Sequence, residues 1–204
     1  MRSKRIAGVL IGLGLAIGLS AAGPETPADR YRIATGDTFR VTTAVVTVMC
    51  PLTVGGSFEA RTSTVVGDVA VADASGAVSG AVQVDLATLQ TGIGLRDRHM
   101  KDKYLEISRG DTFTTARLEE IHLEGAVEGS MPFHGRLTLH GEQHTISGMA
   151  DLQGQRRDGG VRVRARFPIS LAAFGIEPPR YLGVGVRDEV QVQAQFTAMS
   201  ARVH

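Results

Sequence analysis

The stretch of sequence that decides the fold runs from Asp85 to Glu106 and reads DLATLQTGIGLRDRHMKDKYLE. Strand-like alternation enters this stretch, stops at two glycines, and gives way to a short segment that is dense in charged residues. Within that segment Met100 and Tyr104 are spaced one helical turn apart and form an apolar stripe. The sequence therefore predicts one short helix, over Arg96 to Leu105, in a chain whose other segments have the pattern of β-strands.

Period-2 alternation recurs on both sides of this stretch, with apolar residues on one face of each segment and polar residues on the other. Turn residues such as Gly141-Glu142 separate the segments. The pattern predicts about eight strands, near residues 39–46, 62–72, 78–86, 112–123, 133–140, 145–153, 161–169 and 190–198. An up-and-down antiparallel barrel removes the exposed edges that an open sheet leaves, and a two-sheet sandwich is the alternative with the same pattern.

Residues 1–22 have the pattern of a secretory signal peptide. Three basic residues precede a 14-residue apolar run, Ile6 to Leu19, and the small residues Ser20-Ala21-Ala22 follow it. The run is short for crossing a bilayer, so cleavage after Ala22 is favoured over an uncleaved membrane anchor. We therefore expect an exported protein, periplasmic or secreted, whose mature chain has no integral membrane span.

The mature chain would consist of a flexible leader, residues 23–29, and one domain, residues 30–204. The whole sequence holds 22 basic and 21 acidic residues, and removal of the three basic residues of the signal peptide leaves 19 against 21. The mature protein is therefore slightly acidic. Since nucleic-acid binding requires a basic patch or stripe, we expect no nucleic-acid partner.

Several short motifs occur in an order that resembles one known family. They are Leu86, Thr91-Gly92-Ile93, Leu95-Arg96-Asp97, His99-Met100 and Tyr104-Leu105, then Gly135 to Gly141 (GRLTLHG), and finally Phe174-Gly175-Ile176. Together they resemble the signature of the YceI-like family, exported proteins that bind lipids or polyisoprenoids, over roughly residues 29–203. The resemblance implies an all-β fold, an eight-stranded antiparallel lipocalin-like β-barrel with one short α-helix capping an end.

The stretch from Val45 to Ser57 departs from the family pattern, because Met49-Cys50-Pro51 stands where an extended strand and a turn are usual. We expect an insertion here in place of a continuous strand. Cys50 is the single cysteine, so it has no internal disulfide partner. We interpret it as a small buried apolar residue; an intermolecular disulfide or a reactive thiol is the alternative, and a homodimer stays open.

The inward face of the predicted barrel consists mainly of small apolar residues, and the chain has 7 Phe, 3 Tyr and no Trp. Small inward residues leave room for a ligand in an eight-stranded barrel, whereas larger ones would fill it. A lumen of this kind selects an apolar chain by burial alone, at about 0.8 kcal/mol per methylene. We expect the lumen to be lined by Val82, Val84, Leu86, Leu137, Leu139, Ile146, Val163, Phe167, Val192 and Phe196.

The predicted helix would supply the mouth of this lumen. Arg96, His99, Met100 and Tyr104 are the residues that we expect to contact the head group of a ligand. The alternative for Arg96 is a structural role, in which it and Asp97 form ion pairs that tie the helix to the barrel.

The resemblance and the lumen together favour a soluble carrier or sequestering protein for an isoprenoid or other long-chain amphiphilic lipid, not an enzyme. The alternatives are a barrel enzyme that modifies a lipid or isoprenoid through Arg96, Asp97 and His99, a packed structural or stress-response barrel without a ligand, and an outer-membrane barrel. No cofactor and no metal are expected. His140 and His144 lie four apart across a turn without an evident third ligand.

Overall fold

The computed structural model of the protein describes residues 36–72, 76–125, 129–154, 160–181 and 183–201. The predicted signal peptide and leader lie outside these ranges. The strands are β1 (Thr38–Pro51), β2 (Ser57–Thr62), β3 (Val65–Val71), β4 (Ala77–Asp85), β5 (Thr115–Leu123), β6 (Gly129–Leu139), β7 (Glu142–Gly154), β8 (Gly160–Ser170), β9 (Arg180–Tyr181), β10 (Val184–Gly185) and β11 (Glu189–Ser200). The helical elements are η1 (Leu86–Thr88), α1 (Gly94–His99), η2 (Met100–Tyr104), η3 (Ile107–Arg109), α2 (Asp111–Thr114) and η4 (Ala172–Phe174).

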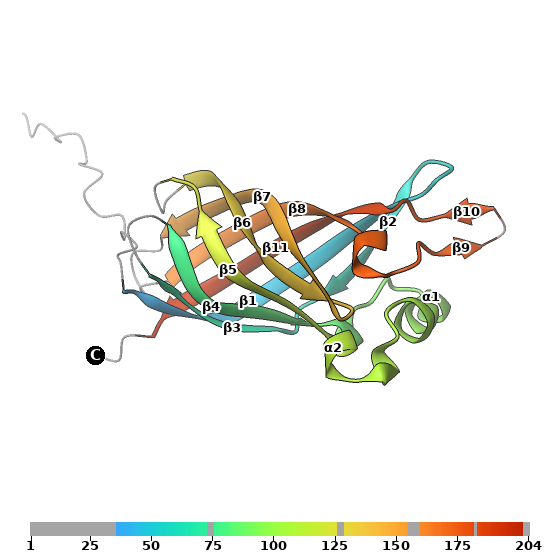
Figure 1. The fold of residues 1–204 in the computed structure, drawn as a ribbon, viewed down its shortest axis with the longest axis horizontal. Coiled ribbons are helices and arrows are strands. Elements are labelled where there is room, and N and C mark those ends of the chain that lie inside the picture. The colour runs from blue at the N-terminus through green and yellow to red at the C-terminus, as the bar shows by residue number, and fades with distance from the viewer. Residues whose placement is uncertain (1–35, 73–75, 126–128, 155–159, 182, 202–204) are drawn as a thin grey trace, which may run out of the picture.

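Nine of these strands form a closed antiparallel barrel with eight strand positions (Figure 1), and β9 and β10 form a separate two-stranded sheet. The order around the barrel is β11-β8-β7-β6-β5-β4-β3-β1, and β1 pairs with β11 to close the ring. The predicted eight-stranded antiparallel barrel is therefore confirmed. Closure satisfies the backbone groups that the edges of an open sheet would leave unpaired.

One position of the ring is shared by β2 and β3. The first residues of β1 pair with β3, and its last six residues pair with β2, with a break at Ser63 and Thr64. The other edge of β3 pairs with β4, whereas the other edge of β2 meets a loop, where two backbone hydrogen bonds of 2.7 and 2.9 Å join Arg61 and Gln90. The predicted strand 62–72 is therefore correct for β3, and the sequence prediction missed β2.

The expected insertion between Val45 and Ser57 is wrong, because β1 continues as a regular strand to Pro51 and only residues 52–56 turn. Val46, Val48 and Cys50 border the cavity whereas Thr47 and Met49 do not, which is the alternation of a strand. Hydrogen bonds to β2 on one side and to β11 on the other hold this segment extended.

One-sided burial explains why the remaining strands follow the sequence pattern. On β8 the inward residues Phe167 and Ile169 are buried. Arg162, Arg164 and Arg166 lie on the outward face of the same strand and are exposed. The strand predicted over 112–123 differs only at its start, where residues 111–114 form the single helical turn α2.

Gly148 on β7 marks a close approach between strands. A Cβ atom at this position would lie 2.2 Å from the carbonyl oxygen of Arg166, 2.7 Å from Cβ of Phe167 and 2.9 Å from Cε1 of Phe133. Only glycine lets β7 pass so near to β8 and to the Phe133 ring of β6.

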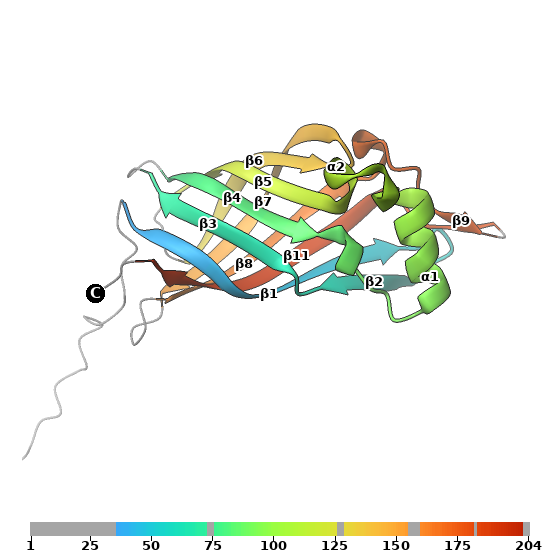
Figure 2. The ribbon, with the colours of Figure 1, turned by 90° about the horizontal axis from the view of Figure 1, so that it is seen from below.

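The predicted helix is present and begins two residues early, at Gly94. It continues from α1 directly into η2, a π-helical turn in which the Leu105 amide donates to the Met100 carbonyl at 2.8 Å. The start is fixed by Asp97, whose Oδ1 accepts hydrogen bonds from the Thr91 amide at 2.7 Å and the Thr91 hydroxyl at 2.6 Å. The helix lies across one end of the barrel (Figure 2), which confirms the predicted cap.

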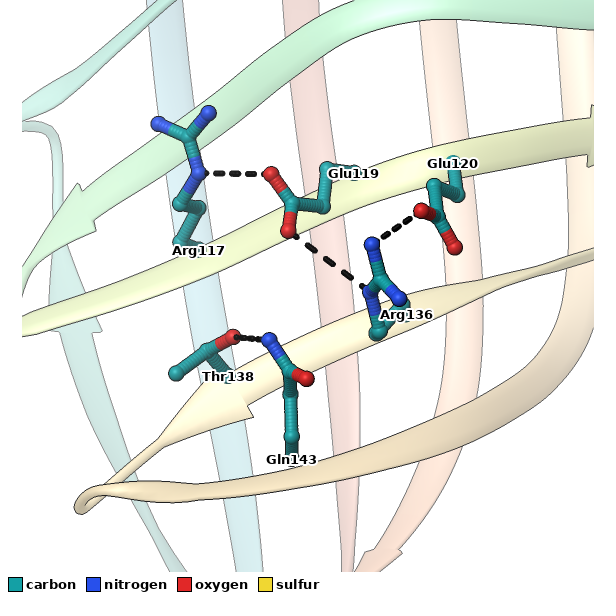
Figure 3. Close-up of polar contacts among 6 residues, drawn as sticks. All are labelled: Arg117, Glu119, Glu120, Arg136, Thr138 and Gln143. Carbon is teal, nitrogen blue, oxygen red and sulfur yellow. Dashed lines mark hydrogen bonds and ion pairs between the residues drawn. The ribbon is translucent and has the colours of Figure 1, made fainter.

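The outer face of β5 and β6 carries a cross-strand group of ion pairs, drawn in Figure 3. Arg117 Nε donates to Glu119 Oε2 at 2.8 Å, and Arg136 lies between Glu119 and Glu120. Glu120 has a positive φ of 50° at an irregularity in the β5–β6 register, so these pairs bridge a bulge. The arginine hydrogen bond lowers the pKa of the Glu119 carboxyl.

Candidate ligand-binding site

A cavity of about 1240 Å³ occupies the inside of the barrel. Its walls are valine, alanine, leucine and phenylalanine side chains contributed by every strand of the ring. Pockets for small ligands commonly measure about 300–1,000 Å³, so this space is large enough for a long-chain molecule. The inward residues are small, and that is why the barrel is hollow.

Nine of the ten residues predicted to line the lumen border this cavity. They are Val82, Val84, Leu86, Leu137, Leu139, Val163, Phe167, Val192 and Phe196. Ile146 is the exception, since it is buried at 6 % exposure but does not border the cavity. It shares a face of β7 with His144, and the Phe174 ring of η4 packs edge-on against His144 with 4.9 Å between ring centroids. The η4 turn therefore covers this part of the wall.

The sequence prediction missed the wall formed by β1 and β2. Val46, Val48 and Cys50 of β1 and Phe58 and Ala60 of β2 border the cavity. The alternation of apolar residues over positions 46–50 could have revealed this wall. It was missed because an insertion was expected in this stretch.

All four residues predicted for the mouth border the cavity: Arg96, His99, Met100 and Tyr104. The guanidinium of Arg96 lies over the Phe58 ring of β2, 4.3 Å from its centroid. This stacking ties α1 to the barrel wall through an aromatic ring, whereas the structural alternative for Arg96 expected an ion pair. Asp97 does not border the cavity, and the two hydrogen bonds from Thr91 lower the pKa of its carboxyl.

The charged side chains that border the cavity are of one sign. Besides Arg96 and His99, the cavity is bordered by Lys103 of η2 and Arg180 of β9, and none of its described lining residues is an aspartate or a glutamate. Lys103 also lies near the Tyr104 ring, with its Nζ 5.4 Å from the centroid. The apolar lumen thus opens past cationic side chains, an arrangement complementary to a ligand with an apolar tail and a hydrogen-bond-accepting or anionic head.

Cys50 is half-buried and borders the cavity on the same side as Phe58. Burial raises the pKa of its thiol to about 11, and the nearby positive charge of Arg96 opposes this increase. The residue is therefore a neutral thiol at ordinary pH, in an apolar environment as expected, but beside the lumen.

His140 lies in the turn between β6 and β7, and His144 lies near the start of β7. The Nδ1 atom of His140 lies 3.1 Å from the Phe174 carbonyl oxygen, and its ring meets Phe113 edge-on at 4.7 Å. His140 is thus a buried strand-end residue with a hydrogen-bond partner, and His144 is exposed, as expected. Within the described part of the chain, no group of three or more histidine, cysteine, aspartate or glutamate residues is placed to hold a metal ion.

A closed antiparallel barrel with an apolar lumen and a helical cap defines a lipocalin-like barrel. The sequence profile of the YceI-like domain matches residues 31–198, and the chain belongs to the YceI-like family. The resemblance seen in the sequence is thereby confirmed. A search of the curated proteins found no match.

Solved structures show the same fold at low sequence identity. BcnA of Burkholderia cenocepacia has a TM-score of 0.63 and 17 % identity, with 76 % of this chain and 96 % of that chain covered. A polyisoprenoid binding domain from Saccharophagus degradans has a TM-score of 0.60 and 16 % identity, with 82 % and 99 % covered. The YceI protein of Campylobacter jejuni has a TM-score of 0.54 and 12 % identity, with 72 % and 87 % covered. Among the described residues, no helix is long and apolar enough to span a membrane.

Proposed function

We propose that this protein binds one long-chain amphiphilic lipid, an isoprenoid or an acyl lipid, with its tail in the barrel lumen and its head at the α1 mouth. The observation that carries the proposal is a cavity of about 1240 Å³ with apolar walls. Its charged lining residues, Arg96, Lys103 and Arg180, are all basic, and His99 also borders it. Burial of each methylene contributes about 0.8 kcal/mol, so a long tail supplies ample affinity without specific contacts.

Selectivity would come from the mouth. Arg96 and Lys103 are held by the aromatic rings of Phe58 and Tyr104, so their cationic ends lie at the entrance to the lumen. A head group rich in acceptor oxygens would gain charge-assisted hydrogen bonds there. The polyisoprenoid binding domain of Saccharophagus degradans, which shares the fold, supports an isoprenoid as the first ligand to test.

The biological role that suits such a binding site is that of an exported soluble carrier or sequestering protein. Residues 1–22 have the signal-peptide pattern, which would direct the protein to the periplasm or the outside of the cell. The rival enzyme hypothesis needs Arg96, Asp97 and His99 to act together on a ligand. Its support is weaker, because Asp97 is engaged by Thr91 and does not border the cavity.

Filling the lumen tests the proposal. Val84 on β4 borders the cavity, so Val84→Trp should place an indole where the tail lies and reduce lipid occupancy by about tenfold or more. The matched control is Val66→Trp on β3, because Val66 is 61 % exposed and does not border the cavity. Native mass spectrometry and organic extraction of the purified proteins measure occupancy, and melting temperatures show that both variants fold.

The proposal predicts one lipid per chain in the parent and in Val66→Trp. A parent protein that carries no lipid and binds none of a panel of isoprenoid and acyl amphiphiles would refute it. Equal occupancy in the parent and in a folded Val84→Trp variant would also refute the lumen as the site.

A further inference from the structure

His140 lies where three elements meet at the capped end of the barrel. Its side chain is 8 % exposed, and its Nδ1 atom lies 3.1 Å from the Phe174 carbonyl oxygen of η4. Its ring packs edge-on against Phe113 of α2, and Figure 1 shows α2 beside the turn between β6 and β7 that carries this histidine. The ring therefore joins the cap segment, residues 94–114, to the barrel wall and to η4.

Both nitrogens of the His140 ring face atoms that accept hydrogen bonds. A carbonyl oxygen can only accept, so Nδ1 carries the proton that it donates to Phe174. Nε2 is buried and lies 3.2 Å from Glu106 Oε2, at an angle that gives it no full hydrogen bond. A neutral imidazole has a single N–H and would turn a bare Nε2 lone pair toward this carboxylate, whereas an imidazolium brings a positive charge to it. The contact with Glu106 is therefore attractive only when His140 is protonated.

Glu106 supplies the negative charge of this pair. Arg109 of η3 donates to the same carboxylate oxygen at 2.6 Å, and this hydrogen bond lowers the pKa of the Glu106 carboxyl. The carboxyl is therefore ionised throughout the range in which histidine side chains titrate, about pH 5–8. Within the pair, His140 is the member whose charge changes in that range.

Four further charged or titratable side chains lie on the elements that pack against this ring. Arg109 of η3 opposes its protonation, and the exposed Asp111 of α2 and Glu142 of β7 favour it. His144 of β7 packs on the η4 side and is exposed to solvent. Among the carboxylates of the described chain, only Glu106 lies within ion-pair distance of the ring, so this pair dominates the response to pH.

The pair lies at the end of the part of the cap that borders the lumen. Tyr104 and Leu105 border the cavity, and Glu106 follows them directly. Glu106 has a positive φ of 49°, so the chain turns sharply at the residue that meets His140. The start of the cap is held separately, through the hydrogen bonds of Asp97 of α1. Loss of the pair would therefore loosen the cap at its later end while its start stays fixed.

We propose that His140 is a pH-sensitive latch on the cap, closed when the ring is protonated and released as the pH rises. At low pH the imidazolium holds both the Phe174 carbonyl and the Glu106 carboxylate. At high pH the neutral ring keeps the carbonyl and loses the carboxylate. Because the cap covers the mouth, a lipid should enter and leave faster at high pH. This last step rests on the proposed function, whereas the latch itself does not.

Hydrogen exchange followed by NMR tests the latch on the purified protein. The reporters are the amides of Leu105, Arg109 and Phe113, whose hydrogen bonds of 2.8, 2.9 and 2.9 Å lie within the cap segment. Their protection factors, which correct for the intrinsic effect of pH on exchange, should fall by about threefold to fivefold between about pH 5 and pH 8. The change is modest because Glu106 is 38 % exposed, so water screens the pair.

Two variants and one control assign the response to this pair. His140→Asn removes Nε2 and keeps a side-chain donor, and asparagine tolerates the positive φ of 54° at this position. Glu106→Gln removes the negative charge. Both variants should lose the pH dependence of cap protection. The matched control is His144→Asn, which should keep the parental response because His144 is exposed and lies outside the pair. Melting temperatures show that all three variants fold.

Protection factors of the parent that do not change with pH would overturn the latch, and so would a parental response in His140→Asn. Release of a pyrene-labelled long-chain alcohol, which has no group that titrates in this range, measures the effect on the mouth. Release should be about threefold to fivefold faster at pH 8 than at pH 5 in the parent and independent of pH in His140→Asn. Release that is independent of pH in the parent would refute control of lipid passage. Failure of the probe to bind, with the exchange response intact, would count against the carrier function and leave the latch in place.

Discussion

Addition of a single methyl group at Gly148 should strongly destabilise the barrel. In Gly148→Ala the new Cβ would meet the Arg166 carbonyl oxygen at 2.2 Å and Cβ of Phe167 at 2.7 Å. Carbon contacts are optimal at about 3.5–4.0 Å, so β7 and β8 would have to separate by about 1 Å or more. Overpacking of flexible side chains costs about 1–3 kcal/mol, and backbone atoms yield less readily, so we expect about 3 kcal/mol or more.

Urea unfolding followed by circular dichroism measures this loss, and a loss of about 3 kcal/mol corresponds to a melting temperature lower by about 6–12 °C. Gly94→Ala is the matched control, because a Cβ at Gly94 meets nothing within 4 Å. It should be neutral or stabilise α1 by up to about 1 kcal/mol. Free energies of unfolding for the two variants that agree within about 0.5 kcal/mol would refute the close approach of β7 and β8.

Two further predictions concern Cys50 and export. Because the pKa of the Cys50 thiol is raised to about 11 in the folded protein, iodoacetamide should label it about a hundredfold more slowly at pH 8 than in the unfolded chain, and equal rates would contradict this environment. The unfolded thiol loses its proton first as the pH rises, so the free energy of unfolding should fall between about pH 9 and pH 11. Protein recovered from the cell envelope should begin near Gly23 by intact-mass measurement, and an intact Met1 terminus would rule out cleavage.

One-sided burial made much of the barrel predictable from the sequence. Strands such as β8 and β11 must alternate, because one face lines the lumen and the other meets water, and nine inward residues could be assigned to the cavity on that basis. The second half of β1 was missed because Pro51 suggests a break. Pro51 is the last residue of the strand, and its carbonyl accepts a hydrogen bond from the Arg187 amide at 2.8 Å, so a proline is tolerated there.

The remaining misses arise from contacts between distant parts of the chain. Alternation gives the face of Ile146 but not its depth, which depends on the η4 turn almost thirty residues later. The cationic mouth shows the same limit. Arg96 and His99 could be assigned from the helix pattern, whereas Arg180 reaches the mouth only because the β9–β10 hairpin bonds to the β1–β2 turn.

The break between β2 and β3 gives the wall of the barrel an uneven stiffness. Over most of its circumference, parting two neighbouring strands would rupture a whole ladder of hydrogen bonds, each contributing about 0.5–1.5 kcal/mol. Beside the mouth, β2 is held on its outer side by the two backbone hydrogen bonds between Arg61 and Gln90 and by the stacking of Arg96 on Phe58. That short seam has the fewest hydrogen bonds to break, so we expect the wall to deform beside the mouth before it deforms at the far end of the barrel.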